Sequence, residues 1–132
     1  MENQDVRWKQ RFGNYCEALN RVEEIAVNFA NLTEIEKDAL IHRFEFTVDL
    51  SWKVMQDYLK YAGYINLKGP RACITQMATD GILDQYHWEE IIECRNTLSH
   101  IYDEEKSRLL LDQIISIHLP NLRLFRSAML TL

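Results

Sequence analysis

Apolar residues recur at every third or fourth position along most of the chain, which is the spacing of one face of a helix. The first such stretch runs from about Val6 to Leu32. Gly13 is expected to weaken it locally, so that the helix begins cleanly only after that residue. The second stretch, Glu34 to Ala62, would be about 43 Å long at the standard helical rise and predicts a long central helix. No alternating strand pattern competes with these stretches.

Residues typical of helix ends separate the apolar stretches. Thr33 followed by Glu36 predicts a capping box, in which the hydroxyl accepts a backbone N–H and the carboxylate reaches back. Gly63 is placed to end the second helix. Pro70 suits the first turn of a short helix that continues through Ala78.

The second half of the chain predicts two further helices. One starts at Asp84 or Gln85 and runs out near His100. Asp103 is the expected N-cap of the last helix, which Pro120 should kink or break because it lacks an N–H and clashes one turn back. The sequence therefore predicts an all-α fold, an antiparallel bundle of four or five helices in a single domain over residues 1–132.

Composition restricts the class of protein further. Hydrophobic residues make up 47% of the 132 residues and the formal charge is −5, which argues against disorder and against indiscriminate nucleic-acid binding. Cys16, Cys73 and Cys94 form no C-x-x-C pair, so reduced thiols are expected in place of a disulfide framework or a zinc site. The N-terminus lacks the apolar core of a signal peptide, and no apolar run approaches the ~20 residues that span a bilayer. We expect a cytoplasmic protein without a membrane segment.

The candidate chemistry lies between the last two predicted helices. Arg95, Asn96, Ser99, His100 and Tyr102 place a cation, an amide, a hydroxyl, an imidazole and a phenol within eight positions. An arginine fork can bind a phosphate bidentately, and an imidazole can move protons to or from a ribose hydroxyl or a leaving oxygen. Those groups suffice for RNA cleavage without a metal or another cofactor.

The spacing of these residues leaves two interpretations open. Arg95 and His100 are five residues apart, about 140° around a regular helix, so they converge only if the helix loosens near Ser99 or if a second copy supplies one group. Asn96 and His100 are one turn apart and can touch. In the alternative, Arg95 pairs with an acidic neighbour and His100 caps carbonyls at a helix end.

A metal site is the less favoured use of the acidic residues on the long helix. His42, Glu45 and Asp49 have helical spacing, but a di-metal bundle uses a Glu-x-x-His pair from each of two helices, and the chain does not contain two such pairs. We expect no metal. Glu45 and Asp49 should pair with basic residues on a neighbouring helix or at a dimer seam.

The segment from Arg95 to Tyr102, followed by Asp-Glu, resembles the R-x-x-x-x-H-x-Y signature of the HEPN superfamily. More closely, the chain is similar to the branch known as nucleotidyltransferase substrate-binding-like proteins. Two further segments carry this similarity in the same order, namely Arg43–Lys53 and Gly69-Pro70-Arg71 leading to Gly81-Ile82-Leu83. The resemblance covers roughly residues 40 to 130.

The resemblance implies a HEPN-like bundle that forms a homodimer, with the signatures of both chains lining a shared cleft. It also implies a minimal nucleotidyltransferase as partner in a toxin–antitoxin pair. In the HepT-type toxins of this group the matching residues are Arg95 and His100 as the ribonuclease pair, with RNA as substrate. Asn96 and Ser99 would support that pair, and Tyr102 would be modified with AMP by the partner. The other implied role is a non-catalytic substrate-binding subunit of the transferase.

Overall fold

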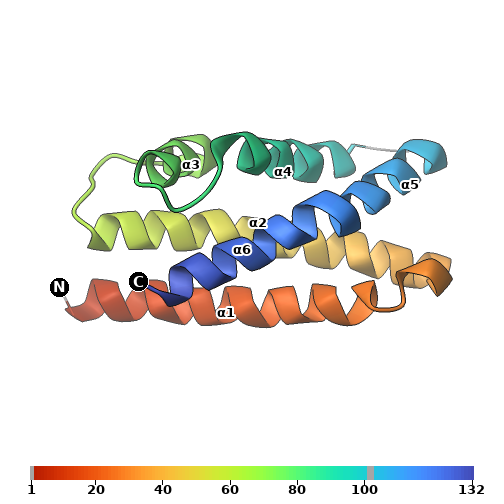
Figure 1. Ribbon diagram of the computed structural model, residues 1–132, viewed down its shortest axis with the longest axis horizontal. Helices are drawn as coiled ribbons and strands as arrows, with labels where there is room; N and C mark the ends of the chain where they lie inside the picture. The colour runs from red at the N-terminus through yellow and green to blue at the C-terminus, as the bar shows by residue number, and fades with distance from the viewer. Residues whose placement is uncertain (1, 101–102) are drawn as a thin grey trace.

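The computed structural model describes residues 2–100 and 103–132, and every regular element in them is helical (Figure 1). This confirms the predicted all-α class. The elements are α1 (Glu2–Ala26), η1 (Phe29–Asn31), α2 (Glu34–Tyr61), α3 (Gly69–Thr79), α4 (Gln85–Leu98), α5 (Glu104–Gln113), η2 (Ile114–His118) and α6 (Leu119–Leu130). None of these helices has both the length and the apolar character that crossing a bilayer requires.

The two longest helices, α1 and α2, run antiparallel along most of the bundle (Figure 1). The prediction that the first helix begins cleanly only after Gly13 is wrong, because α1 begins at Glu2 and continues through Gly13 without interruption. Trp8 and Phe12, which precede the glycine on the inner face of α1, are 2% and 8% exposed, and Trp8 packs edge-on against Tyr58 of α2. This burial outweighs the roughly 1 kcal/mol that a glycine costs inside a helix.

The ends of α2 follow the predicted local signals. The Thr33 hydroxyl accepts the Glu36 N–H at 3.1 Å, and the Glu36 carboxylate accepts the Thr33 N–H at 3.0 Å, which confirms the capping box. At the other end Gly63 takes a φ of +104°, where a side chain would be strained. The Tyr64 N–H then donates back to the Leu59 carbonyl at 3.0 Å, so the chain leaves the helix sharply.

The core contains buried side chains of α1, α2, α3, α4 and α6, and aromatic rings join several of these helices. The Phe125 ring of α6 contacts both Tyr15 of α1 and Trp88 of α4, with ring centroids 5.4 and 5.1 Å apart. The buried Tyr15 hydroxyl donates to the Leu122 carbonyl at 2.8 Å. These contacts fix the rotation of α4 within the bundle, and that rotation decides which of its side chains face α2.

The C-terminal helical path is continuous from Glu104 to Leu130, with the π turn η2 directly before Pro120. Pro120 therefore does not end the helix, since the wider turn lies next to the position where its ring would clash. In this wider turn the residue four positions after Ile114, rather than the one three positions after it, lies on the buried face. Both Ile114 and His118 are consequently buried, whereas Ile117 is 42% exposed.

Candidate functional site

The end of α4 carries the predicted polar segment. The helix starts at Gln85, within the predicted bounds, and the Asp84 carboxylate caps it by accepting the His87 N–H at 3.0 Å. The helix ends at Leu98, and the His100 N–H donates to the Thr97 carbonyl at 3.0 Å in a tighter turn. The regular helix thus stops between Arg95 and His100. The buried residues of its inner face are Trp88, Ile91, Cys94 and Leu98.

The Arg95 guanidinium is held by a bidentate ion pair to Asp49 of α2. Its Nε donates to one carboxylate oxygen at 2.9 Å and its Nη2 donates to the other at 3.1 Å. Its Nη1 donates to the Ser99 hydroxyl at 2.8 Å, one turn along α4. The predicted pairing of Asp49 with a basic residue on a neighbouring helix is confirmed. Arg95 is therefore anchored from both α2 and the end of α4.

Glu45 lies one helical turn before Asp49 and adds a second carboxylate to the cluster. One of its oxygens is 3.8 Å from Arg95 Nη1 and 3.4 Å from the Ser99 hydroxyl. The hydrogen bonds from Arg95 to Asp49, followed by the charges of both carboxylates, raise the pKa of the guanidinium against the opposing effect of burial. One arginine and two carboxylates leave the cluster with a net charge of −1. The three side chains remain a quarter to two fifths exposed, so a ligand in solvent can reach them.

Two other predicted site residues, Asn96 and His100, make no side-chain hydrogen bond to this cluster in the described part of the chain. Asn96 is exposed on a different side of α4, where it lines a groove of about 310 Å³ with Arg71 of α3. His100 is exposed in the turn after α4. Among the described residues, no hydrogen bond joins the His100 imidazole to Arg95 or Asn96. Within the single chain Arg95 thus bonds to Ser99 but not to His100, and Tyr102 lies outside the described residues.

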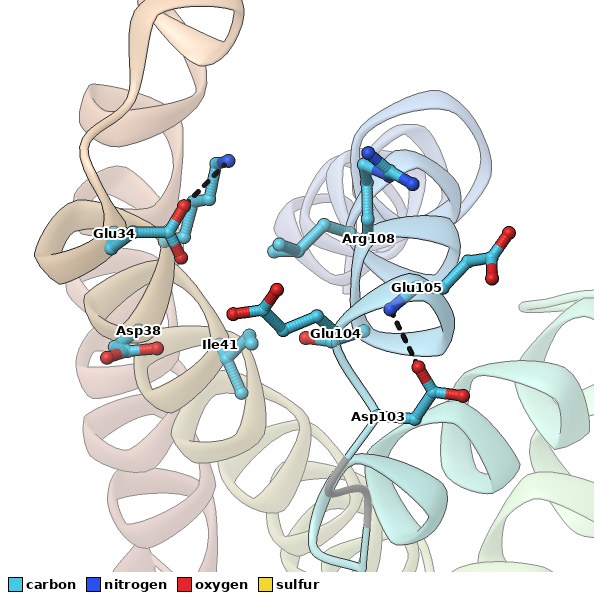
Figure 2. Close-up of a pocket in the computed structure, with 10 residues that line it drawn as sticks. Glu34, Asp38, Ile41, Asp103, Glu104, Glu105 and Arg108 are labelled. Atoms are coloured by element: carbon cyan, nitrogen blue, oxygen red, sulfur yellow. Dashed lines mark hydrogen bonds and ion pairs between the residues drawn. The ribbon is translucent and has the colours of Figure 1, made fainter.

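A larger groove of about 720 Å³ lies between the first turns of α2 and α5 (Figure 2). Asp103 caps α5 as predicted, its carboxylate accepting the Glu105 N–H at 2.9 Å. Figure 2 shows Glu34 and Asp38 on the α2 side of the groove and Glu104 on the α5 side, with its carboxylate directed toward α2. Sequence reasoning missed this juxtaposition, because the acidic residues come from segments far apart in the chain. The lining residues are Glu34, Lys37, Asp38, Ile41, Asp103, Glu104, Glu105, Ser107, Arg108 and Leu111.

The side chains of His42, Glu45 and Asp49 on α2 do not come together as a metal site. His42 is exposed and lines a separate groove with Arg43 and Phe46, whereas Glu45 and Asp49 face Arg95. Within residues 2–100 and 103–132, no three His, Cys, Asp or Glu side chains are arranged to hold a metal ion.

Comparison with known proteins identifies the family. The family model described as nucleotidyltransferase substrate binding protein like matches residues 10–130. A crystal structure of a protein from Thermus thermophilus is similar with a TM-score of 0.75 and 25% sequence identity, over 89% of this chain and 97% of that one. No curated protein matches the chain. The match over nearly the whole chain shows that it belongs to the nucleotidyltransferase substrate-binding-protein-like family.

Proposed function

We propose that this chain is the helical partner of a separate minimal nucleotidyltransferase in a toxin–antitoxin pair, and that the end of α4 is the segment on which the partner acts. The observation that carries the proposal is the anchoring of Arg95, which fixes one member of the signature at a partly exposed helix end. The family description supports association with such an enzyme. The sequence contains no P-loop or glycine-rich dinucleotide loop of its own, consistent with nucleotide transfer by the partner.

In this proposal the transferase silences the chain by modifying Tyr102. The phenol oxygen attacks the α-phosphorus of ATP, a new O–P bond forms, pyrophosphate leaves, and the phenol proton passes to a base or to water. The product carries a phosphodiester anion and an adenine two residues after His100. That anion would compete for Arg95, and the adenine would cover the exposed imidazole.

The unmodified chain would then act as a metal-independent endoribonuclease in the cytoplasm. Arg95 would bind the RNA phosphodiester, and His100 would transfer a proton to or from the ribose hydroxyl or the leaving oxygen. The two groups are not bonded to one another within one chain, so we propose a homodimer of this single-domain chain that brings them together across a shared cleft.

The acidity of the site favours a second candidate function, a non-catalytic binding subunit of the same transferase. The Arg95 cluster has a net charge of −1, and the groove between α2 and α5 has five carboxylates against Lys37 and Arg108. Such a surface repels the RNA backbone, whose binding depends on cationic contacts. In this candidate the segment from Arg95 to Tyr102 only presents a nucleotide, or itself, to the enzyme.

Cleavage of RNA by the purified chain in the presence of EDTA separates these candidates. We expect RNA fragments from the native chain and none from the Arg95→Ala or His100→Ala variants. His42→Ala is the matched control, because it removes an exposed imidazole from another surface. Intact RNA at high protein concentration, with stable co-elution of the transferase, would instead establish the binding subunit.

Incorporation of AMP tests the proposed role of Tyr102. The transferase should label the native chain from α-labelled ATP and should not label Tyr102→Phe, which is expected to keep its activity when the two proteins are combined. Tyr86→Phe removes another exposed phenol and should be labelled like the native chain. Undiminished labelling and silencing of Tyr102→Phe would refute the assignment.

A further inference from the structure

The bonds made by Arg95 leave a defined part of its guanidinium open. A guanidinium has five N–H donors in a rigid plane. Asp49 accepts from Nε and from Nη2, and the Ser99 hydroxyl accepts from Nη1. One N–H therefore remains on each terminal nitrogen. Because Asp49 binds two adjacent nitrogens, it fixes the plane of the group and hence the direction of the remaining donors.

Glu45 lies beside the open part of Arg95 without bonding to it. Its oxygen is 3.8 Å from Nη1, which is too far for a hydrogen bond, and 3.4 Å from the Ser99 hydroxyl. Its negative charge therefore adds to the potential near Nη1, and it holds the guanidinium only indirectly, by accepting a hydrogen bond from the Ser99 hydroxyl that Nη1 contacts. Asp49 and Glu45 differ in geometry although both are carboxylates on the same face of α2.

We propose that the two carboxylates have opposite effects on a phosphodiester bound by Arg95. Asp49 is a positioning residue that aims the two remaining N–H donors at the ligand, and Glu45 is an electrostatic gate that opposes its entry. The inference rests on the proposed function in taking the ligand to be a phosphodiester of the RNA backbone. It does not depend on cleavage or on the transferase.

The opposition follows from the charges and the bonds. An arriving phosphodiester adds one negative charge to a cluster that is already at −1. Removing the Glu45 charge lowers this repulsion and leaves the bidentate bond to Asp49 intact. Removing the Asp49 charge lowers the repulsion to a similar extent but also releases the guanidinium plane. A change of one charge thus has different consequences at the two positions.

Binding of a short fluorescein-labelled RNA with 2′-O-methyl sugars tests the inference on the full chain. The modified sugars prevent cleavage, so fluorescence anisotropy at one fixed salt concentration reports binding alone. We expect Glu45→Gln to bind about two- to five-fold more tightly than the native chain, the range of a partly exposed charge interaction. Asp49→Asn should bind no more tightly than the native chain. Asp49→Glu restores a carboxylate, so when both substitutions are compared in the Glu45→Gln background, Asp49→Glu should bind more tightly than Asp49→Asn.

Two control variants make the result specific. Glu24→Gln changes the net charge by the same amount on an exposed position of α1, from which α4 is separated by α2 (Figure 1). It should leave the affinity at the native value. Arg95→Ala should abolish the gain caused by Glu45→Gln. Thermal unfolding of each variant verifies that it is folded at the assay temperature.

Several outcomes would overturn the inference. Equal gains from Glu45→Gln and Glu24→Gln would mean that Glu45 acts only through net charge. An equal gain in affinity from Asp49→Asn and Glu45→Gln would mean that Asp49 does not position Arg95. If neither the native chain nor any variant bound the RNA, Arg95 would not be a phosphodiester-binding residue. Failure of the transferase to modify Tyr102, with the expected pattern of RNA affinities, would refute the proposed function and leave the inference standing.

Discussion

Replacing His118 with leucine should stabilise the protein, although histidine is the native residue. The side chain is 3% exposed, and neither ring nitrogen has a hydrogen-bond partner among the described residues. Its ring stacks on Phe44 of α2, with centroids 5.9 Å apart and an angle of 26° between the planes. Leucine has a similar bulk and no polar atoms, so it removes an unpaired polar group without leaving a large cavity.

The size of the effect follows from two opposing contributions. An unpaired buried polar group costs about 1–3 kcal/mol, and the variant recovers that cost. The lost ring stack contributes about 0.5–1.5 kcal/mol in the other direction. The free energy of unfolding at neutral pH should therefore rise by about 1 kcal/mol, which corresponds to a melting temperature roughly 4 °C higher for a chain of this size.

The advantage of His118→Leu should grow in acid. Burial lowers the pKa of His118 below its ordinary value; His87 acts in the same direction, and Glu90 opposes it. The unfolded chain therefore takes up a proton at this position at higher pH than the folded chain does. The stability associated with neutral His118 is present above the ordinary histidine pKa of about 6.5 and is lost as pH falls below it. Leucine does not titrate, so the difference between the two proteins should widen from pH 7.5 to pH 5.

Urea unfolding followed by circular dichroism, at several pH values between 5 and 7.5, measures both effects. His42→Leu is the matched control, since its imidazole is exposed and its loss should change the free energy of unfolding by no more than about 0.5 kcal/mol. A variant that is less stable than the native protein at pH 7, with a difference that does not change with pH, would refute the reasoning.

Three further predictions concern backbone and thiol positions. Gly13→Ala should raise the free energy of unfolding by about 0.5–1 kcal/mol, because the new Cβ inside α1 meets no atom within 4 Å. Gly63→Ala should lower it by about 1 kcal/mol or more, because Gly63 has a φ of +104°. Melting temperatures of the two variants that shift in the same direction would contradict this. Thr33→Ala should lose about 1 kcal/mol in thermal unfolding through the capping box, and an unchanged melting temperature would refute that contribution. Burial raises the pKa of Cys73 to about 11 and that of Cys94 to about 12. DTNB at pH 8 should therefore leave both thiols unmodified in the folded protein and modify both in urea. Rapid modification of either thiol without urea would contradict its burial.

The helices and most of their ends could be predicted from the sequence because the determining interactions are local. A capping side-chain oxygen and the backbone N–H that donates to it lie within one turn of each other, as at Thr33, Asp84 and Asp103. The conformational freedom of Gly63 is likewise a property of the residue itself. The family could also be predicted from the sequence, and its family model matches residues 10–130.

Only the tertiary structure decided which groups meet. Arg95 bonds to Asp49, 46 residues earlier, because the packing of α4 against α2 turns that face of the helix inward. The same rotation leaves Asn96 facing a different groove, although it adjoins Arg95 in sequence. Burial of His118 in place of Ile117 depends on the π turn and on the neighbouring helices. Helix formation follows from contacts three or four residues apart, whereas the site depends on how complete helices rotate against one another, which no single segment of sequence encodes.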